Sequence, residues 1–199
     1  MKPLPATERG RRTRAAIVAA AAELMHQHGL AGVSMDGVLA ASGAGKSQLY
    51  HYFDSRRDLA VAVLHHQFER VMAAQPALRD PACDGLEVWR DQVLTTLLEH
   101  GYAMCPLGAF VGQVDDEPEL STTLAELFDR WQAALAEMVD RARGHGRVRQ
   151  DVDPGDAGRM LLAALEGGTM LAHVHRQATP LRQSLDAAIA LLTTGRAAG

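Results

Sequence analysis

Two short helices joined by a glycine turn are predicted for Ser34 to Arg57, SMDGVLAASGAGKSQLYHYFDSRR, and this pattern leaves few folds open to the chain. Ser34 can cap the first helix with its hydroxyl, and Gly43 supplies the backbone freedom that a sharp turn between helices requires. In the second helix, Leu49 and Phe53 are four residues apart and therefore face one core. This layout is typical of a helix-turn-helix that reads DNA.

The same segment resembles the helix-turn-helix of the TetR family of one-component transcriptional regulators. The run GAGKSQLYHYF, followed by Arg56 and Leu59, is similar to the family's Gly-Val-Ser-Lys-Gly-Thr-Leu-Tyr-His-His-Phe followed by a lysine and an apolar residue. The chain departs from this pattern at Ala44, at Gly45 in place of a serine cap, and at Ser47-Gln48 in place of Gly-Thr. We therefore expect an operator preference of its own.

The resemblance implies a division of roles among the polar residues of the second helix. It implies that four residues contact the DNA backbone: Lys46, Tyr50, Tyr52 and Arg56. It places three others nearest the bases: Ser47, Gln48 and His51. Ser34 and Gly45, at the starts of the two helices, are predicted as further contacts. Gln48 is expected to read a base, because a carboxamide can contact adenine through two hydrogen bonds.

GAGKS also looks like the end of a nucleotide-binding P-loop, which has the pattern Gly-x4-Gly-Lys-Ser/Thr after a strand. The first glycine of that pattern would stand at position 40, which is Ala40, and the preceding VLAAS follows helical spacing. A phosphate-binding loop is therefore disfavoured. The chain also carries no Ser/His/Asp elbow and no paired carboxylate motif, so we predict neither an enzyme nor a cofactor.

Charge is unevenly distributed along the chain. Residues 1–57 hold eight Lys and Arg against four Asp and Glu, a balance of +4, whereas the remainder holds twelve against twenty, a balance of −8. DNA phosphates attract the first part and repel the second. We predict a helix-turn-helix domain at 1–57 and a helical ligand-binding and dimerisation domain at 58–199. Without an apolar leader or a run that could span a bilayer, a cytoplasmic protein with no membrane partner is expected.

Apolar residues recur at helical spacing along nearly the whole chain, which predicts an all-α fold of about nine helices. Beyond the helix-turn-helix, helices are expected at Thr13 to His28, from a capping box at Ser55 to Asp58 until before Pro76, at Asp84 to His100, at Pro118 to Arg143, at Pro154 to Arg176 and at Pro180 to Thr194. The run GYAMCPLG breaks this series, and a helix is expected to restart near Pro106.

A homodimer is expected because one reading helix covers only a few base pairs, whereas a twofold pair reads both halves of a palindrome. TetR-like proteins build a four-helix dimer interface from their last two helices, and the resemblance implies the same use here. The spacing alone also fits an ordinary intramolecular core. The candidate interface residues are Ala164, Gly167, Gly168, Leu181, Leu185, Ala188 and Leu192.

The resemblance also implies a small-molecule effector that binds in the domain at 58–199. Its binding would alter the separation of the two helix-turn-helix domains of the dimer. Aromatic and methionine residues can form an adaptable apolar cavity, although the same residues also suit plain core packing. The candidates are Trp89, Tyr102, Met104, Cys105, Phe110, Phe128, Trp131, Met138, Met170 and His173. An apolar or aromatic compound is expected. The complete prediction is a ligand-responsive repressor that binds double-stranded palindromic operator DNA and is released by this compound.

Cys105 raises an alternative function, since MCPLGAF resembles a TetR subgroup in which some members sense electrophiles through a thiol at this place. A helix N-terminus would favour its thiolate, whereas a lone cysteine is more often inert packing. The alternative is a thiol or small-molecule sensor that acts through a protein partner without specific DNA binding. No metal site is predicted, because the HQH, HH and HVH histidines point apart on a helix.

Overall fold

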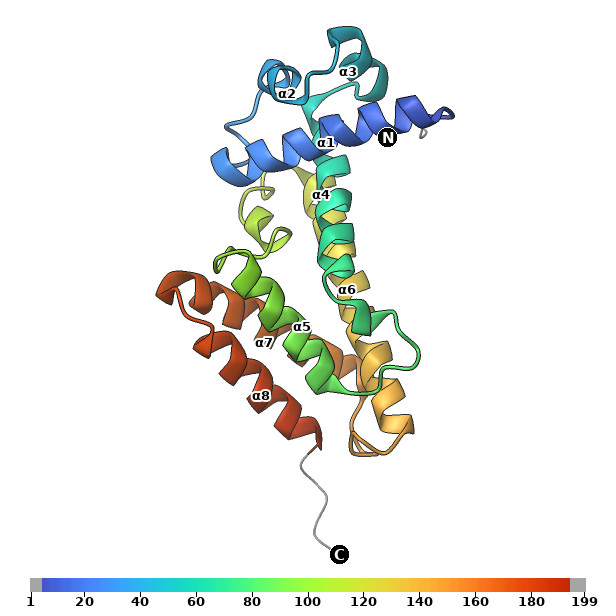
Figure 1. Cartoon of the computed structure of the whole chain (residues 1–199), viewed down its shortest axis with the longest axis vertical. Helices are drawn as coiled ribbons and strands as arrows, with labels where there is room; N and C mark the ends of the chain where they lie inside the picture. The colour runs from blue at the N-terminus through green and yellow to red at the C-terminus, as the bar shows by residue number, and fades with distance from the viewer. Residues whose placement is uncertain (1–4, 194–199) are drawn as a thin grey trace, which may run out of the picture. The chain divides into compact units, whose positions relative to one another are not determined.

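A computed structural model describes residues 5–193, and in this range the regular structure is entirely helical, which confirms the all-α class. The described range contains eight α-helices, close to the nine expected, and two 3-10 turns. Thr194, the expected end of the last helix, lies outside the described residues. The elements are α1 (Glu8–His28), α2 (Met35–Ser42), α3 (Lys46–Tyr52), α4 (Arg56–Ala73), η1 (Pro76–Leu78), α5 (Leu86–Glu99), η2 (Gly108–Phe110), α6 (Pro118–Gly144), α7 (Pro154–His175) and α8 (Thr179–Thr193) (Figure 1).

The first helix is longer than the apolar spacing suggested. It begins at Glu8 rather than Thr13, because Thr7 caps it: the Thr7 hydroxyl accepts the N–H of Gly10 at 3.1 Å. A threonine in extended backbone at this position satisfies one of the N–H groups that a helix start leaves without an intrahelical partner. The arginine-rich stretch that follows is therefore helical rather than a loose tail.

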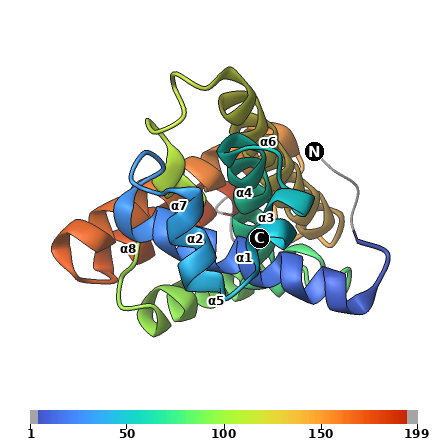
Figure 2. The ribbon, with the colours of Figure 1, turned by 90° about the horizontal axis from the view of Figure 1, so that it is seen from above.

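The helix-turn-helix forms as predicted. The Ser34 hydroxyl accepts the N–H of Gly37 at 3.1 Å and caps α2, and Gly43 ends that helix in the left-handed region at φ 66°. Leu49 and Phe53 are fully buried, and α2 and α3 both pack against α1 (Figures 1 and 2). Because the glycine turn joins two helices rather than a strand and a helix, the P-loop alternative is excluded.

The chain divides into two compact units, each formed by two separate stretches of the sequence. Unit 1 comprises residues 1–70 and 109–127, and unit 2 comprises residues 71–108 and 128–199. Unit 1 therefore adds η2 and the start of α6 to the helix-turn-helix and most of α4. The expected division at residue 57 stays a prediction.

In unit 2, α7 and α8 form the most extensive helix pair and lie side by side (Figures 1 and 2), and α5 packs on α8 and η1. The interior of this unit contains a polar centre. The indole N–H groups of Trp89 and Trp131 point at the same acceptor, Oε1 of the buried Gln75, at 2.7 and 3.4 Å, and the amide nitrogen of Gln75 donates to the Val71 carbonyl at 3.1 Å. One glutamine thus satisfies two buried indoles that would otherwise be costly to desolvate.

None of the described helices combines the length and the apolar composition that crossing a membrane would require.

Candidate functional site

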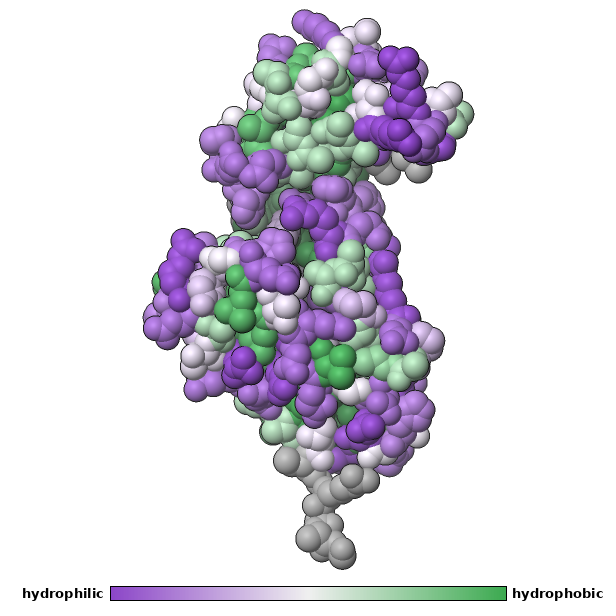
Figure 3. Space-filling view, in the orientation of Figure 1, coloured by the Kyte–Doolittle hydropathy of each residue, from purple (hydrophilic) through white to green (hydrophobic). Residues whose placement is uncertain are grey.

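The surface of α3 is polar on the side opposite its core anchors. The side chains are exposed at Lys46, Ser47, Tyr50 and His51, and half-buried at Gln48 and Tyr52. Around the N-terminal end of α1, hydrophilic residues dominate the surface (purple in Figure 3). Helix α3 therefore presents hydroxyl, ammonium and imidazole groups outward, while the buried Leu49 anchors it to the core. This is the arrangement that binding in a DNA groove requires.

Gln48 is already engaged. Its carboxamide oxygen accepts the N–H of Gly45, the N-cap residue of α3, at 2.9 Å. The two-bond contact with adenine that the sequence suggested needs both the oxygen and the nitrogen of the carboxamide. In this arrangement the nitrogen is free to donate, and the oxygen already accepts one hydrogen bond.

Arg56 and Gln113 hold the loop that precedes α2 from two sides. One guanidinium nitrogen of Arg56 donates to the Leu30 carbonyl at 2.9 Å, and the Leu30 N–H donates to Oε1 of Gln113 at 2.7 Å. Next to them, Arg57 pairs with Glu117 at 2.9 Å. Arg56, expected on DNA phosphates, thus already supports the helix-turn-helix. The partners Gln113 and Glu117, which lie in the loop between η2 and α6, were missed because no local pattern indicates them.

Two family models match the chain. The model described as "Bacterial regulatory proteins, tetR family" matches residues 17–63, and the "Tetracyclin repressor-like, C-terminal domain" model matches residues 83–188, more than half of the chain. The chain belongs to the TetR family. TetR-family proteins are transcriptional repressors with a helix-turn-helix DNA-binding domain, and ligand-responsive regulation by dimers is typical of them.

Curated relatives and solved structures agree with this assignment. The repressor LfrR of Mycolicibacterium smegmatis is 30% identical over 96% of this chain and 95% of its own length. The reduced form of Escherichia coli NemR matches with a TM-score of 0.77 at 19% identity, over 94% of this chain and 100% of that one. A TetR regulatory protein of Rhodobacter sphaeroides matches at 0.78 and 19%, over 90% and 98%. These TetR relatives are transcriptional regulators, not enzymes.

The effector candidates are distributed over both units of the chain. Trp89, Trp131 and Met138 are buried, and Phe128 stacks on Trp131 with ring centroids 6.1 Å apart, so these residues form core packing in unit 2. The Met170 side chain, by contrast, is 49% exposed on α7.

The remaining candidates lie in two places. Phe110 is buried in unit 1. In unit 2, the backbone carbonyl of the half-buried Tyr102 lies 2.9 Å from Nδ1 of His173. Met104, which follows Tyr102 closely in the sequence, is also half-buried. His173 thus binds the backbone of the turn after α5.

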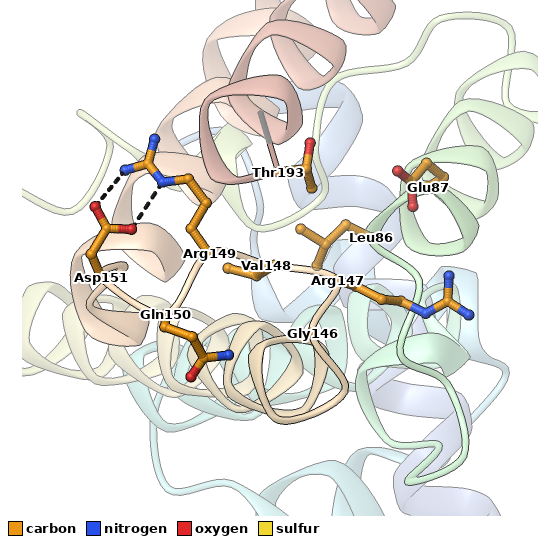
Figure 4. A pocket seen from close by; sticks show the side chains of 9 residues that line it. All are labelled: Leu86, Glu87, Gly146, Arg147, Val148, Arg149, Gln150, Asp151 and Thr193. Atoms are coloured by element: carbon orange, nitrogen blue, oxygen red, sulfur yellow. Dashed lines mark hydrogen bonds and ion pairs between the residues drawn. The ribbon is translucent and has the colours of Figure 1, made fainter. Parts of the chain in front are cut away.

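Two cavities of unit 2 are lined by other residues. One has a volume of about 800 Å³ and contains a doubly bonded ion pair between Arg149 and Asp151, at 2.9 and 3.1 Å (Figure 4). Its lining consists of Leu86, Glu87, Gly146, Arg147, Val148, Arg149, Gln150, Asp151 and Thr193. The other, of about 560 Å³, is a groove between the end of α4, η1 and α5. Neither is lined by an effector candidate.

The expected helix N-terminus at Cys105 is wrong, because only the 3-10 turn η2 follows it. Cys105 is buried, and the Gly108 N–H donates to its sulfur at 3.3 Å. Burial, followed by the neighbouring Glu166 carboxyl, raises the pKa of the Cys105 thiol well above its ordinary value. The thiol is therefore protonated at neutral pH, which disfavours the alternative of an electrophile sensor, since the thiolate is the reactive form.

Glu166 of α7 was not expected from the sequence. Its Oε1 atom is buried without a hydrogen-bond partner, and its Oε2 atom lies so close to Gly108 that a Cβ there would be 2.5 Å away. Burial raises the pKa of Glu166 above its ordinary value. A side chain at position 108 would therefore require the Glu166 carboxyl to move.

The raised pKa of Glu166 predicts a pH-dependent stability. Below the ordinary glutamate pKa of 4.5 the carboxyl is protonated in both states, and as pH rises from there the unfolded state ionises first, so wild-type stability falls until the folded-state pKa is passed. Glu166→Gln removes this loss. We expect the variant to gain about 1 kcal/mol relative to wild type between pH 4.5 and 7 in urea titrations. Glu137→Gln, on an exposed position of α6, is the control, and an equal pH trend in both variants would contradict the assignment.

The apolar stripe of α8 belongs to the chain's own core. Leu181, Leu185, Ala188 and Leu192 are buried, and a Cβ on Gly168 of α7 would lie 2.9 Å from the Leu181 Cα atom. These five residues were predicted at the dimer interface, but in the structure they are buried within the chain, and Gly168 packs closely against Leu181 of α8. Half-buried Ala164 and Gly167 remain nearer the surface, and nothing lies within 4 Å of a Cβ at Gly167.

A different apolar stripe stays exposed on the same two helices. Its members are large apolar side chains with 43% to 66% exposure: Met170, Leu171 and Val174 of α7 and Leu191 of α8. Met170, Leu171 and Val174 are close together in the sequence of α7, and an exposed apolar patch is a candidate for contact with a partner.

Proposed function

We propose that the protein represses transcription by binding a palindromic operator as a homodimer, and that a small molecule bound in its helical body releases it. The polar face of α3, opposite the buried Leu49, is the observation that carries the DNA-binding part. Lys46, Tyr50 and Tyr52 are proposed to hold phosphates, and Ser47 and His51 to face base edges. Because the partner is operator DNA, the proposed place of action is the cytoplasm.

The helix starts complete the proposed DNA surface. Ser34 is exposed at the start of α2, and Gly45 at the start of α3. Arg56 keeps further N–H groups beyond the one bonded to Leu30, and we propose that these approach a phosphate at the edge of the contact.

Dimerisation is proposed through the exposed stripe of α7 and α8, namely Met170, Leu171, Val174 and Leu191. Gly167 lies on α7 one turn before this stripe, and its lack of a side chain supports close approach of a partner helix. A twofold contact of this kind pairs each stripe with its own copy.

The effector is proposed to be an apolar or aromatic compound that enters unit 2 near the two tryptophans. Their shared bond to Gln75 supplies a polar point in an otherwise apolar interior. A ligand acts on DNA binding only if it binds the two conformations unequally. Quenching or shift of tryptophan emission on addition of candidate compounds is the measurement that detects such binding.

Fluorescence anisotropy tests the proposed function directly. Purified protein is titrated against duplex DNA from upstream of its own gene and against a scrambled duplex, each at two salt concentrations. Selective binding that weakens with salt supports the proposal, since phosphate contacts release counterions. Equal affinity for both duplexes, or no binding to a pool of random duplexes, contradicts it.

Lys46→Ala is expected to weaken binding to operator and scrambled duplexes by a similar factor. The lysine supplies one phosphate contact without sequence information, so the slope of log affinity against log salt should fall in magnitude by about 1. Arg159→Ala serves as the control, because Arg159 is an equally exposed cation on α7. A change in sequence preference with Lys46→Ala would place this residue at the bases instead.

A further inference from the structure

Helix α3 starts without the side-chain cap that most helices have. Its N-cap residue is Gly45, in extended backbone at φ −72° and ψ 148°, with no side chain to accept a hydrogen bond. The first N–H groups of a helix have no intrahelical partner, and a serine, threonine, asparagine or aspartate normally accepts one of them. In a helix of seven residues the loss of a cap affects a large share of the structure.

Gln48 supplies a cap from the other direction. It is the third residue of α3, and its side chain turns back so that Oε1 accepts the Gly45 N–H at 2.9 Å. Because a backbone N–H only donates, the acceptor must be the carboxamide oxygen and not its nitrogen. This is one half of a capping box, the half in which the third helical residue bonds back to the N-cap residue.

We propose that Gln48 is a positioning residue for α3, which holds the start of the helix through the hydrogen bond from the Gly45 N–H to its carboxamide oxygen and leaves its amide hydrogens to face DNA. This inference rests on the proposed DNA binding. Amide hydrogens suit the acceptors of guanine, N7 and O6, whereas the paired contact with adenine would require the oxygen to leave Gly45 or to accept a second hydrogen bond. The residue therefore sets both the orientation of α3 and the class of base edge it favours.

Position 45 offers a rescue for this role. A Cβ on Gly45 would lie 3.4 Å from Oε1 of Gln48, an ordinary contact, and the extended backbone suits serine. In Gly45→Ser the new hydroxyl can accept the Gln48 backbone N–H and cap α3 without the Gln48 side chain. The two positions are thus predicted to be interchangeable for capping and different for base contact.

Amide hydrogen exchange in the full-length protein tests the cap without DNA. We expect Gln48→Ala to speed exchange of the Gly45 amide by about fivefold, the effect of one helix cap, and Gln48→Glu to keep it slow, because a carboxylate also accepts the bond. Equal exchange of the Gly45 amide in wild type and Gln48→Ala would overturn the proposal.

Affinity for the best duplex selected from a random pool tests the consequence for DNA. We expect Gln48→Ala to bind about fivefold more weakly, and the double variant Gly45→Ser, Gln48→Ala to regain most of that loss. A double variant that stays weak and discriminates less at one adenine position overturns the proposal, because Gln48 would then be a direct reader of that base. If wild type selects no duplex, the proposed function fails, and the exchange result alone decides whether Gln48 caps α3.

Discussion

Val174→Asp is expected to convert the dimer to monomers and to weaken operator binding by about 100-fold or more. Val174 is 66% exposed within the exposed stripe of α7 and α8. In a twofold interface each substitution occurs twice, so two carboxylates would be buried in an apolar contact. Monomers then bind half-sites singly and lose the gain from linking two heads, which is typically two or more orders of magnitude.

Light scattering after size exclusion measures the mass, and anisotropy on the same sample measures DNA binding. Val88→Asp is the matched control, since Val88 is 49% exposed on α5 and lies outside the stripe. We expect this control to remain dimeric with unchanged affinity. A dimeric Val174→Asp protein with full operator affinity would show that another surface joins the two copies.

Gly158→Ala is expected to destabilise the protein by about 3 kcal/mol and to lower its Tm by roughly 10 °C. A Cβ at this position of α7 would lie 2.8 Å from the Gln132 carbonyl oxygen and 2.9 Å from the Ala136 nitrogen, both in the backbone of α6. Backbone cannot turn aside as a flexible side chain can, so α7 would have to move away from α6. The loss of packing outweighs the gain of about 1 kcal/mol that alanine brings to a helix interior.

Thermal unfolding by circular dichroism measures this effect. Gly144→Ala is the control, because Gly144 is exposed at the end of α6 and nothing lies within 4 Å of its added Cβ. We expect its Tm to match or slightly exceed that of wild type. Equal Tm values for the two variants would mean that α7 and α6 are less closely packed than the structure shows.

Short-range sequence patterns predicted the helix-turn-helix well. Ser34 and Gly43 each act through neighbours within a few residues, so their sequence context contains the information that places them. The α3 cap was harder, because it requires knowing that Gln48 bends back toward Gly45 rather than outward.

The spacing of apolar residues alone did not show which surface a helix packs against. Leu181 and Leu185 form a regular apolar stripe, and spacing cannot tell whether such a stripe faces the same chain or a second copy. The structure assigns it to α7. The exposed stripe that includes Val174 was hidden in the sequence among histidines, which weakened its pattern.

Polar groups that act across long stretches of sequence were also missed. Gln75 serves Trp89 and Trp131, which are 14 and 56 residues away, and Gln113 serves Leu30 across 83 residues. A glutamine in a helix or a turn looks like ordinary solvent-facing surface. Only the three-dimensional arrangement shows that its amide oxygen is the acceptor a buried or constrained N–H depends on.

The hydrogen bond between Leu30 and Gln113 determines which residues must be transferred when a helix-turn-helix is moved from one regulator to another. A segment ending at residue 57 would carry the Leu30 N–H and Arg57 into a new protein but leave Gln113 and Glu117 behind. The inherited module is therefore discontinuous: a chimera retains the geometry of its donor only if residues 109–117 travel with the N-terminal segment, or if the recipient already places an acceptor and a carboxylate at those points.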